Sequence, residues 1–313
     1  MLASTGAAFV AALPACASTN ALGGRAFGSG WRLVLSSDTD QNAAAAVVTR
    51  VVQEVDASLS PWRNDSEIGV FNRSRKTRWQ SCSDAVAKVT SECLWVAGFT
   101  DGAFDPTVGP LVARFGFGPI RGRAGVWRDI TIRAGQLRKA APDLTLDFCG
   151  IAKGYALDQI SDGLKSLGVS DALVELGGEV RAMGRHPGGA RWRVGIERPG
   201  LGPLEMQRVV SPGARSLATS GTTTQGYAVD DRSIGHLINP QLGRPIPGGA
   251  FSVSVLAETG IRADALATAL AVMGPDRGTD FASSMGIAAM FATASAGSVR
   301  ETMTGDFAKH VIA

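Results

Sequence analysis

A carboxylate and a hydroxyl lie one helical turn apart in the segment Arg262–Met273. Asp264 and Thr268 are four residues apart in the sequence, so on a helix they share one face, with Cβ atoms about 5–6 Å apart. Leu266 and Leu270 beside them are apolar, so the helix is otherwise of a buried type. Mg²⁺ prefers oxygen ligands, commonly one or two carboxylates with phosphate and water. The spacing therefore favours a magnesium site, but a helix cap at Asp264 and a bond from Thr268 back to its own helix remain open.

A second segment, 146–158, combines a predicted strand end, a glycine turn and a helix start. Gly150 lies in the turn and Lys153 follows in the first turn of the helix. Unpaired backbone N–H groups and the helix dipole favour an anion at such an end, and a lysine ammonium suits phosphate. Many strand–helix turns carry these residue types, so the segment alone is not specific.

Three further places offer groups for binding or catalysis. The loop Gly102–Pro110 is rich in turn residues and holds one carboxylate, Asp105, although two prolines also suit a rigid connector. Trp62 beside Arg63 can stack on a planar ring or simply pack at a helix end. His236 is one of only three histidines and is the best candidate for a general base, against the alternative of a structural histidine.

Composition limits the classes of protein and partner. The chain has 313 residues, 45% apolar and 19% charged, which suits one large domain or two closely packed ones. Its net charge is only +3 and no run of five like charges occurs, so a nucleic acid partner is not indicated. The four cysteines, Cys16, Cys82, Cys93 and Cys149, form no CxxC pair, which argues against a structural zinc site.

The N-terminal segment differs in character from the rest. Residues 1–19 are small and apolar without a charge, and Leu13–Cys16 is similar to a lipoprotein processing site. A secretory signal begins with basic residues, whereas the first basic residue here is Arg25. We expect residues 1–22 to be an export signal, with a lipid anchor at Cys16, or else a disordered tail. No stretch reaches the about 18 apolar residues that span a bilayer.

Apolar periodicity predicts helices and strands that alternate irregularly. Apolar residues at three- and four-residue steps predict four helices, at 47–59, 86–96, 152–167 and 261–273. Short runs predict strands at 31–36, 144–148, 173–176, 192–196, 207–210, 251–256 and 287–291. Because no regular βαβ order appears, we predict the α+β class. A GxGxxG fingerprint and a GxxxxGK[ST] loop are both absent from the sequence, so neither common nucleotide fold is indicated.

Nine ordered motifs together resemble one family, the ApbE family of FAD:protein FMN transferases. They are AFGSGW at 26–31, LSPWRNDSEIGVFN at 59–72, GAFDPTVGPLV at 102–112, LDFCGIAKGYALD at 146–158, LVELGGEVRAMG at 173–184, WRVGIERP at 192–199, ATSG at 218–221, HLINPQLGRP at 236–245 and ADALATALAVMG at 263–274. The resemblance implies mixed sheets with packed helices, related to the T-fold, in one compact catalytic unit over residues 23–313.

The resemblance also implies roles for individual residues. FAD is the expected substrate, and Mg²⁺ is expected on Asp264, Thr268 and the carbonyl of Gly150. The residues implied to contact FAD are Phe27, Trp62, Ala103, Phe104, Asp105, Asp147 and Lys153. His236 is implied to take the proton from a Thr or Ser hydroxyl of an acceptor flavoprotein, which receives FMN while AMP leaves.

Departures from the family pattern concern the acceptor side. Asn239 stands where the family commonly has an acid, Leu242 replaces a usual threonine, and Thr222–Thr224 follow ATSG in place of aromatic or acidic residues. Two alternatives to the transferase stay open: a periplasmic flavin-binding accessory protein, favoured by Asn239, and a metal-dependent FAD pyrophosphatase. The family's exported character implies a periplasmic or membrane-anchored location and a membrane-associated acceptor.

Overall fold

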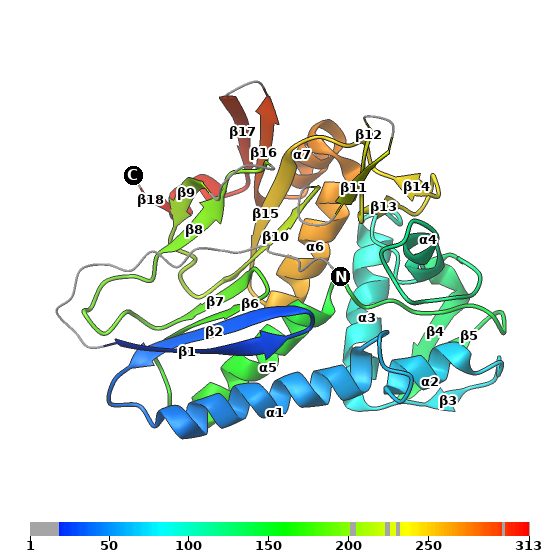
Figure 1. The fold of residues 1–313 in the computed structure, drawn as a ribbon, viewed down its shortest axis with the longest axis horizontal. Coiled ribbons are helices and arrows are strands. Elements are labelled where there is room, and N and C mark those ends of the chain that lie inside the picture. Colours follow the sequence, from blue (N-terminus) through cyan, green and yellow to red (C-terminus); the bar gives the residue numbers. More distant parts are fainter. Residues whose placement is uncertain (1–18, 201–204, 223–225, 230–231, 296–297, 313) are drawn as a thin grey trace.

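An eight-stranded antiparallel sheet forms the centre of the molecule (Figure 1). The computed structural model describes residues 19–200, 205–222, 226–229, 232–295 and 298–312. The strand order in the large sheet is β1-β2-β6-β7-β10-β15-β16-β17. These strands are β1 (Thr19–Ala26), β2 (Ser29–Ser36), β6 (Ala172–Leu176), β7 (Glu179–Met183), β10 (Ser216–Gly221), β15 (Phe251–Ala257), β16 (Ala288–Ser295) and β17 (Ser298–Thr304).

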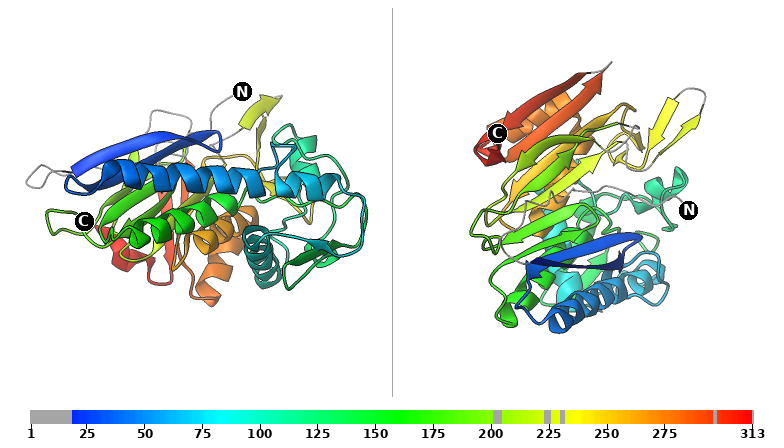
Figure 2. Two further views of the ribbon diagram at one scale, coloured as in Figure 1. Left: turned by 90° about the horizontal axis from the view of Figure 1, so that it is seen from below. Right: turned by 60° about the vertical axis from the view of Figure 1, so that its left-hand side comes forward.

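Helices cover one face of this sheet. Helices α1, α5 and α6 lie side by side, and α6 packs on β10 and β15 (Figure 2). The helices are α1 (Gln41–Leu59), α2 (Glu67–Arg73), α3 (Asp84–Phe99), α4 (Gly109–Arg114), α5 (Ala152–Ser166), α6 (Gly260–Met273) and α7 (Pro275–Ser284). Alternate strand residues such as Val174 and Val253 join the main core on this side, as expected where successive side chains point to opposite faces.

A small sheet covers the opposite face. It has the order β18-β9-β8, with β8 (Val194–Glu197), β9 (Met206–Val210) and β18 (Val311–Ile312). Trp192 and Phe307 are buried there against Leu173 and Met290 of the large sheet in a second apolar cluster. The two clusters make the large sheet a central layer between helices and a smaller sheet.

Short elements form one end of the molecule, on the right in Figure 1. A three-stranded sheet has the order β3-β5-β4, and two hairpins pair β11 with β12 and β13 with β14. These strands are β3 (Gln80–Ser81), β4 (Ile130–Arg133), β5 (Gln136–Lys139), β11 (Gly226–Val229), β12 (Arg232–Gly235), β13 (Ile238–Asn239) and β14 (Arg244–Pro245).

The predicted α+β class is confirmed, and the four predicted helices are present as α1, α3, α5 and α6. The strand predicted at 144–148 is wrong: apart from one bridge between Arg123 and Leu144, the segment is irregular. The reason is a side chain, because the Asn72 amide donates to the carbonyl of Leu146 and accepts from its N–H, both at 2.8 Å. These two hydrogen bonds satisfy the N–H and C=O groups that would otherwise pair with a neighbouring strand.

Two findings bear on the N-terminal segment. Strand β1 begins at Thr19, so residues 19–22 belong to the sheet, while residues 1–18, with Cys16, lie outside the described residues. Within the described ranges, each helix is too short or too polar to cross a membrane.

Candidate active site at the junction of two helices

Helices α5 and α6 touch at a pair of glycines. A Cβ atom added to Gly154 would lie 2.1 Å from the carbonyl oxygen of Gly260, and one added to Gly260 would lie 2.5 Å from that of Gly154. Both distances are far below a normal contact, so only glycine permits this approach. The glycines therefore set how closely the polar faces of the two helices meet.

Each of these helices is capped by a carboxylate from the other. Asp264 of α6 accepts a hydrogen bond from the N–H of Gly154 at 2.9 Å. Asp158 of α5 accepts from Gly260 at 2.7 Å and from Ile261 at 3.0 Å. Neither helix is capped by the side chain of its own N-cap residue. The exchange satisfies orphan N–H groups at both N-termini and fixes Asp264 at the start of α5.

Thr268 faces the turn before α5. Its hydroxyl lies 3.5 Å from the carbonyl oxygen of Gly150 and 3.4 Å from the hydroxyl of Ser220 on β10. Asp264 and Thr268 thus share one face, as predicted. Asp264 caps α5 and not its own helix, and the hydroxyl of Thr268 is directed to Gly150 and Ser220 and not back to a carbonyl of α6. Ser220 received no role from the sequence, although it belongs to the ATSG motif and that motif was the available signal.

These groups form an oxygen-rich donor set. Oδ2 of Asp264 is taken by Gly154, whereas Oδ1 accepts no hydrogen bond from the described residues. Asp264 is 3% exposed. Burial raises the pKa of its carboxyl group, and the positive charge of Lys153 offsets part of this increase. One carboxylate oxygen, one hydroxyl and one carbonyl suit a hard cation that also binds phosphate and water. The described residues contain no cluster of three or more His, Cys, Asp or Glu, so a metal here would take its remaining oxygen ligands from water or a bound phosphate.

Lys153 is held by a buried acid that the sequence did not identify. Its ammonium donates to Glu179 at 2.7 Å and to the carbonyl of Gly177 at 3.2 Å. Burial raises the pKa of Glu179 to about 8, even though the positive charge of Lys153 acts to lower it. The Oε2 atom of Glu179 is buried and has no hydrogen-bond partner among the described residues. Glu179 thus fixes the position of the ammonium predicted to meet phosphate. The GGE triplet in the motif at 173–184 was the available signal.

The hairpin turn at Phe27 lies beside this pair. Phe27 and Gly28 have φ values of 50° and 76° and join β1 to β2. A Cβ atom on Gly177 would lie 2.6 Å from the hydroxyl oxygen of Ser29 and 3.2 Å from Cδ of Lys153. The turn, Gly177 and Lys153 are therefore in contact, which brings the predicted residue Phe27 to the neighbourhood of the lysine.

The loop before α4 also reaches the site. A ring carbon of Phe104 lies 3.4 Å from where a Cβ of Gly150 would be. Asp105 is used within the loop: it accepts from the N–H and hydroxyl of Thr107 at 2.8 and 2.7 Å and from the N–H of Trp127 at 3.0 Å. Both of its oxygens are engaged, so Asp105 shapes the loop, whereas Phe104 faces the site.

Asp147 and Ala103 complete this side. Asp147 accepts from the N–H of Cys149 at 2.9 Å, and its own N–H donates to the carbonyl of Pro106 at 2.7 Å. Burial raises the pKa of the Asp147 carboxyl group. Ala103 is 5% exposed. The loop at 103–106 and the turn at 147–150 are therefore bonded to each other.

Trp62 and His236 lie on separate peripheral elements. Trp62 occupies the turn between α1 and α2 and is 66% exposed. His236 directly follows β12, and its ring meets Phe117 edge to face at 6.3 Å. Phe117 in turn stacks on Tyr227 of β11 at 5.4 Å. The predicted base thus belongs to the arm formed by the two hairpins, β11–β12 and β13–β14, and not to the helix junction.

Two of the departures from the family pattern, Asn239 and Thr222, have structural roles. Asn239 accepts from the N–H groups of Gln241 and Leu242, both at 3.0 Å. An aspartate makes the same two bonds, so this turn does not require the acid. The hydroxyl of Thr222 bonds the carbonyl of Phe251 at 3.2 Å, and residues 223–225 lie outside the described residues.

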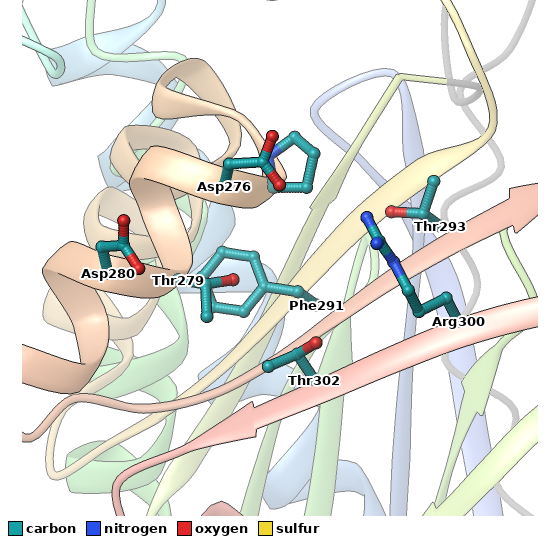
Figure 3. Close-up of a pocket in the computed structure, with 8 residues that line it drawn as sticks. Asp276, Thr279, Asp280, Phe291, Thr293, Arg300 and Thr302 are labelled. Atoms are coloured by element: carbon teal, nitrogen blue, oxygen red, sulfur yellow. The ribbon is translucent and has the colours of Figure 1, made fainter.

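A separate pocket lies between α7 and the β16–β17 hairpin. Figure 3 shows Asp276, Asp280 and Arg300 around it, with the Phe291 ring between Asp280 and Arg300. None of the site residues predicted from the sequence lines this pocket. The candidate active site is therefore the junction of α5 and α6, where several of those residues meet.

The comparisons with known proteins agree with the motifs. The model of the ApbE family matches residues 27–291. A FAD:protein FMN transferase of Vibrio cholerae is 35% identical over 253 residues, which are 76% of each chain. One of Klebsiella pneumoniae is 32% identical over 309 residues, covering 92% of this chain and 88% of its own.

Solved structures agree as well. The flavin transferase ApbE from Vibrio cholerae superposes with a TM-score of 0.84 at 31% identity, over 94% of this chain and 100% of that one. The apo form of the Pseudomonas stutzeri flavinyl transferase ApbE gives 0.83 at 32% identity, over 94% and 97%. The resemblance drawn from the nine motifs is confirmed, and this chain belongs to the ApbE family.

Proposed function

We propose that the protein transfers the FMN half of FAD to a Thr or Ser hydroxyl of an acceptor flavoprotein and releases AMP. The observation that carries the proposal is the convergence of Asp264, Thr268 and the Gly150 carbonyl at the start of α5. Relatives at 32–35% identity named FAD:protein FMN transferase support the same activity.

The metal in this proposal is Mg²⁺. The donor set fits it, because Asp264 offers a free carboxylate oxygen in a place where Thr268 and Gly150 offer two neutral ones. When bound, the ion supplies positive charge that offsets the charge of the diphosphate. Lys153, fixed by Glu179, adds a second positive charge beside it. The loop that contains Phe104 would bind the adenosine or ribose, and Phe27 would pack against a ring face of FAD.

The reaction needs one proton acceptor. His236 takes the proton of the acceptor hydroxyl, and the hydroxyl oxygen forms a bond to the FMN phosphorus. The bond between that phosphorus and the bridging oxygen breaks, and AMP leaves with the bonding electrons. The arm that carries His236 is the natural place for the acceptor, since Tyr227 and Leu242 on it are 43% and 60% exposed.

We also propose that the protein works outside the cytoplasm, on a membrane-associated acceptor and with a lipid anchor at Cys16. Support for this comes from the apolar segment 1–19 and its Leu13–Cys16 motif.

One assay separates transfer from its two alternatives. The protein is incubated with FAD, Mg²⁺ and a candidate acceptor domain, and AMP, free FMN and the acceptor mass are measured. Transfer gives AMP and an acceptor heavier by one FMN. Free FMN with unmodified acceptor identifies a pyrophosphatase, and bound FAD without AMP identifies a flavin carrier.

Two controls sharpen the assay. Chelation of the metal should stop AMP release, and re-added Mg²⁺ should restore it. His236→Ala should slow transfer by about 100-fold or more, the usual contribution of a general base, while FAD binding measured by fluorescence stays unchanged. Equal rates for His236→Ala and the unmodified protein would reject His236 as the base.

A further inference from the structure

Helix α2, the loop after it and the β3-β5-β4 sheet lie together at the lower right of Figure 1, and they carry six exposed cations. They come from the end of α2, the loop that follows it and the outer face of the β3-β5-β4 sheet. We name this group the basic surface: Arg73, Arg75, Lys76, Arg78, Arg133 and Arg138. None of the six forms an ion pair with a carboxylate of the described residues. The sequence alone does not show this surface, because its charges come from two segments about 60 residues apart.

Local bonds hold the loop of the basic surface in shape. The hydroxyl of Ser74 donates to the Gln80 side chain at 2.7 Å, and the Gln80 amide donates to the carbonyl of Lys76 at 3.2 Å. In the adjoining strand β5, Leu137 and Lys139 are buried, whereas Arg138 between them is exposed. Loop closure and strand alternation thus direct the cations outward.

An open pocket lies within the basic surface. Its lining combines three cations with two polar side chains and one apolar one: Arg73, Arg75, Lys76, Ser74, Gln80 and Val70. Val70 is 53% exposed. Cations beside an exposed apolar side chain match a ligand in which a phosphate adjoins apolar groups, as in a phospholipid at a membrane surface.

Other polyanions fit these features less well. The guanidinium groups of Arg133 and Arg138 lie 4.1 and 4.9 Å from the ring centre of Trp79. That ring is therefore engaged, whereas proteins that bind single-stranded nucleic acid offer aromatic rings for stacking. An acidic peptide would use the cations but has no need for the exposed Val70.

We propose that the basic surface docks the protein on a membrane that carries anionic phospholipids. This contact is independent of the flavin reaction and of any lipid anchor. It acts through several cations near the membrane surface, so it weakens as salt rises.

The test measures binding to vesicles by flotation. The full chain carries Cys16→Ser, so that no acyl chain contributes, and the vesicles contain equal phosphatidylglycerol and phosphatidylcholine, or phosphatidylcholine alone. Binding is expected to the anionic vesicles only, and to decrease with added salt. Arg75→Gln, Lys76→Gln and Arg78→Gln together should reduce the partition coefficient about 100-fold, since each cation near an anionic membrane surface strengthens binding about fivefold.

A matched triple variant removes the same charge elsewhere. Arg191, Arg277 and Lys309 are exposed and form no ion pair with the described residues, so their replacement by Gln should leave vesicle binding nearly unchanged. Equal losses in both triples, or equal binding to neutral vesicles, would overturn the proposal. Binding of a polyglutamate peptide or single-stranded DNA that depends on the basic surface, with no vesicle binding, would overturn it in favour of that partner. The melting temperature of each variant, compared with that of the unmodified protein, reports whether the variant is folded.

Discussion

The α5–α6 junction and the arm that carries His236 are built in opposite ways. At the junction, Asp264 is 3% exposed and two helices exchange carboxylate caps across a glycine contact. The arm consists of two hairpins with strands of two to four residues, with Leu242 60% exposed. A buried junction held by reciprocal helix caps suits a ligand that never changes, whereas an exposed arm can adapt to a protein acceptor. In the proposed reaction, the junction holds FAD and the arm meets the acceptor.

The largest expected effect is on AMP release, and it distinguishes the proposed metal-binding role of Asp264 from its role as a helix cap. Asp264→Asn keeps an oxygen for the N–H of Gly154 but loses the negative charge toward the metal, so AMP release should fall by about 10³-fold or more. Asp158→Asn is the matched control, because Asp158 caps α6 in the same way but serves no ligand role here. It should lower the melting temperature and leave the rate per folded molecule nearly intact. Similar rate losses in both variants would mean that the junction acts only through stability.

The next effect tests the glycine contact. In Gly154→Ala the new methyl group would lie 2.1 Å from the carbonyl oxygen of Gly260 and 2.8 Å from Cβ of Asp264. Overpacking of this kind costs about 1–3 kcal/mol of unfolding free energy, or more where backbone must move. Gly30→Ala is the control, since its nearest atom would be 3.4 Å away. Urea unfolding of both variants measures the difference, and equal midpoints would show that the helices can separate without loss.

The smallest effect is expected in the arm. Asn239→Asp restores the acid common in the family, yet both side chains accept from the N–H groups of Gln241 and Leu242. An added charge at a partly exposed position contributes less than ~1 kcal/mol, so transfer should change by less than about fivefold. Transfer rates at several acceptor concentrations provide the measurement. A gain of 100-fold would instead show that the acid acts on His236 and that the present chain is a poor transferase.

Much of the site could be anticipated from local pattern. The four-residue spacing of Asp264 and Thr268 and the apolar periodicity around them predict a helix with one polar face, and the structure contains it. The strand predicted at 144–148 failed because its backbone bonds go to Asn72, a residue more than 70 positions earlier. Glu179 and Ser220 were missed for a related reason: each gains its role from a partner on another element, Lys153 or Thr268.

The sequence by itself determined the helix faces, the class of the fold and, through nine motifs in order, the family. These depend on periodicity and on local residue order, which a chain carries before it folds. Only the tertiary structure decided that Asp264 caps the neighbouring helix, that Asp105 is used up within its loop and that cations from two segments form one surface. Such features depend on which elements pack together, and long-range packing has no period in the sequence.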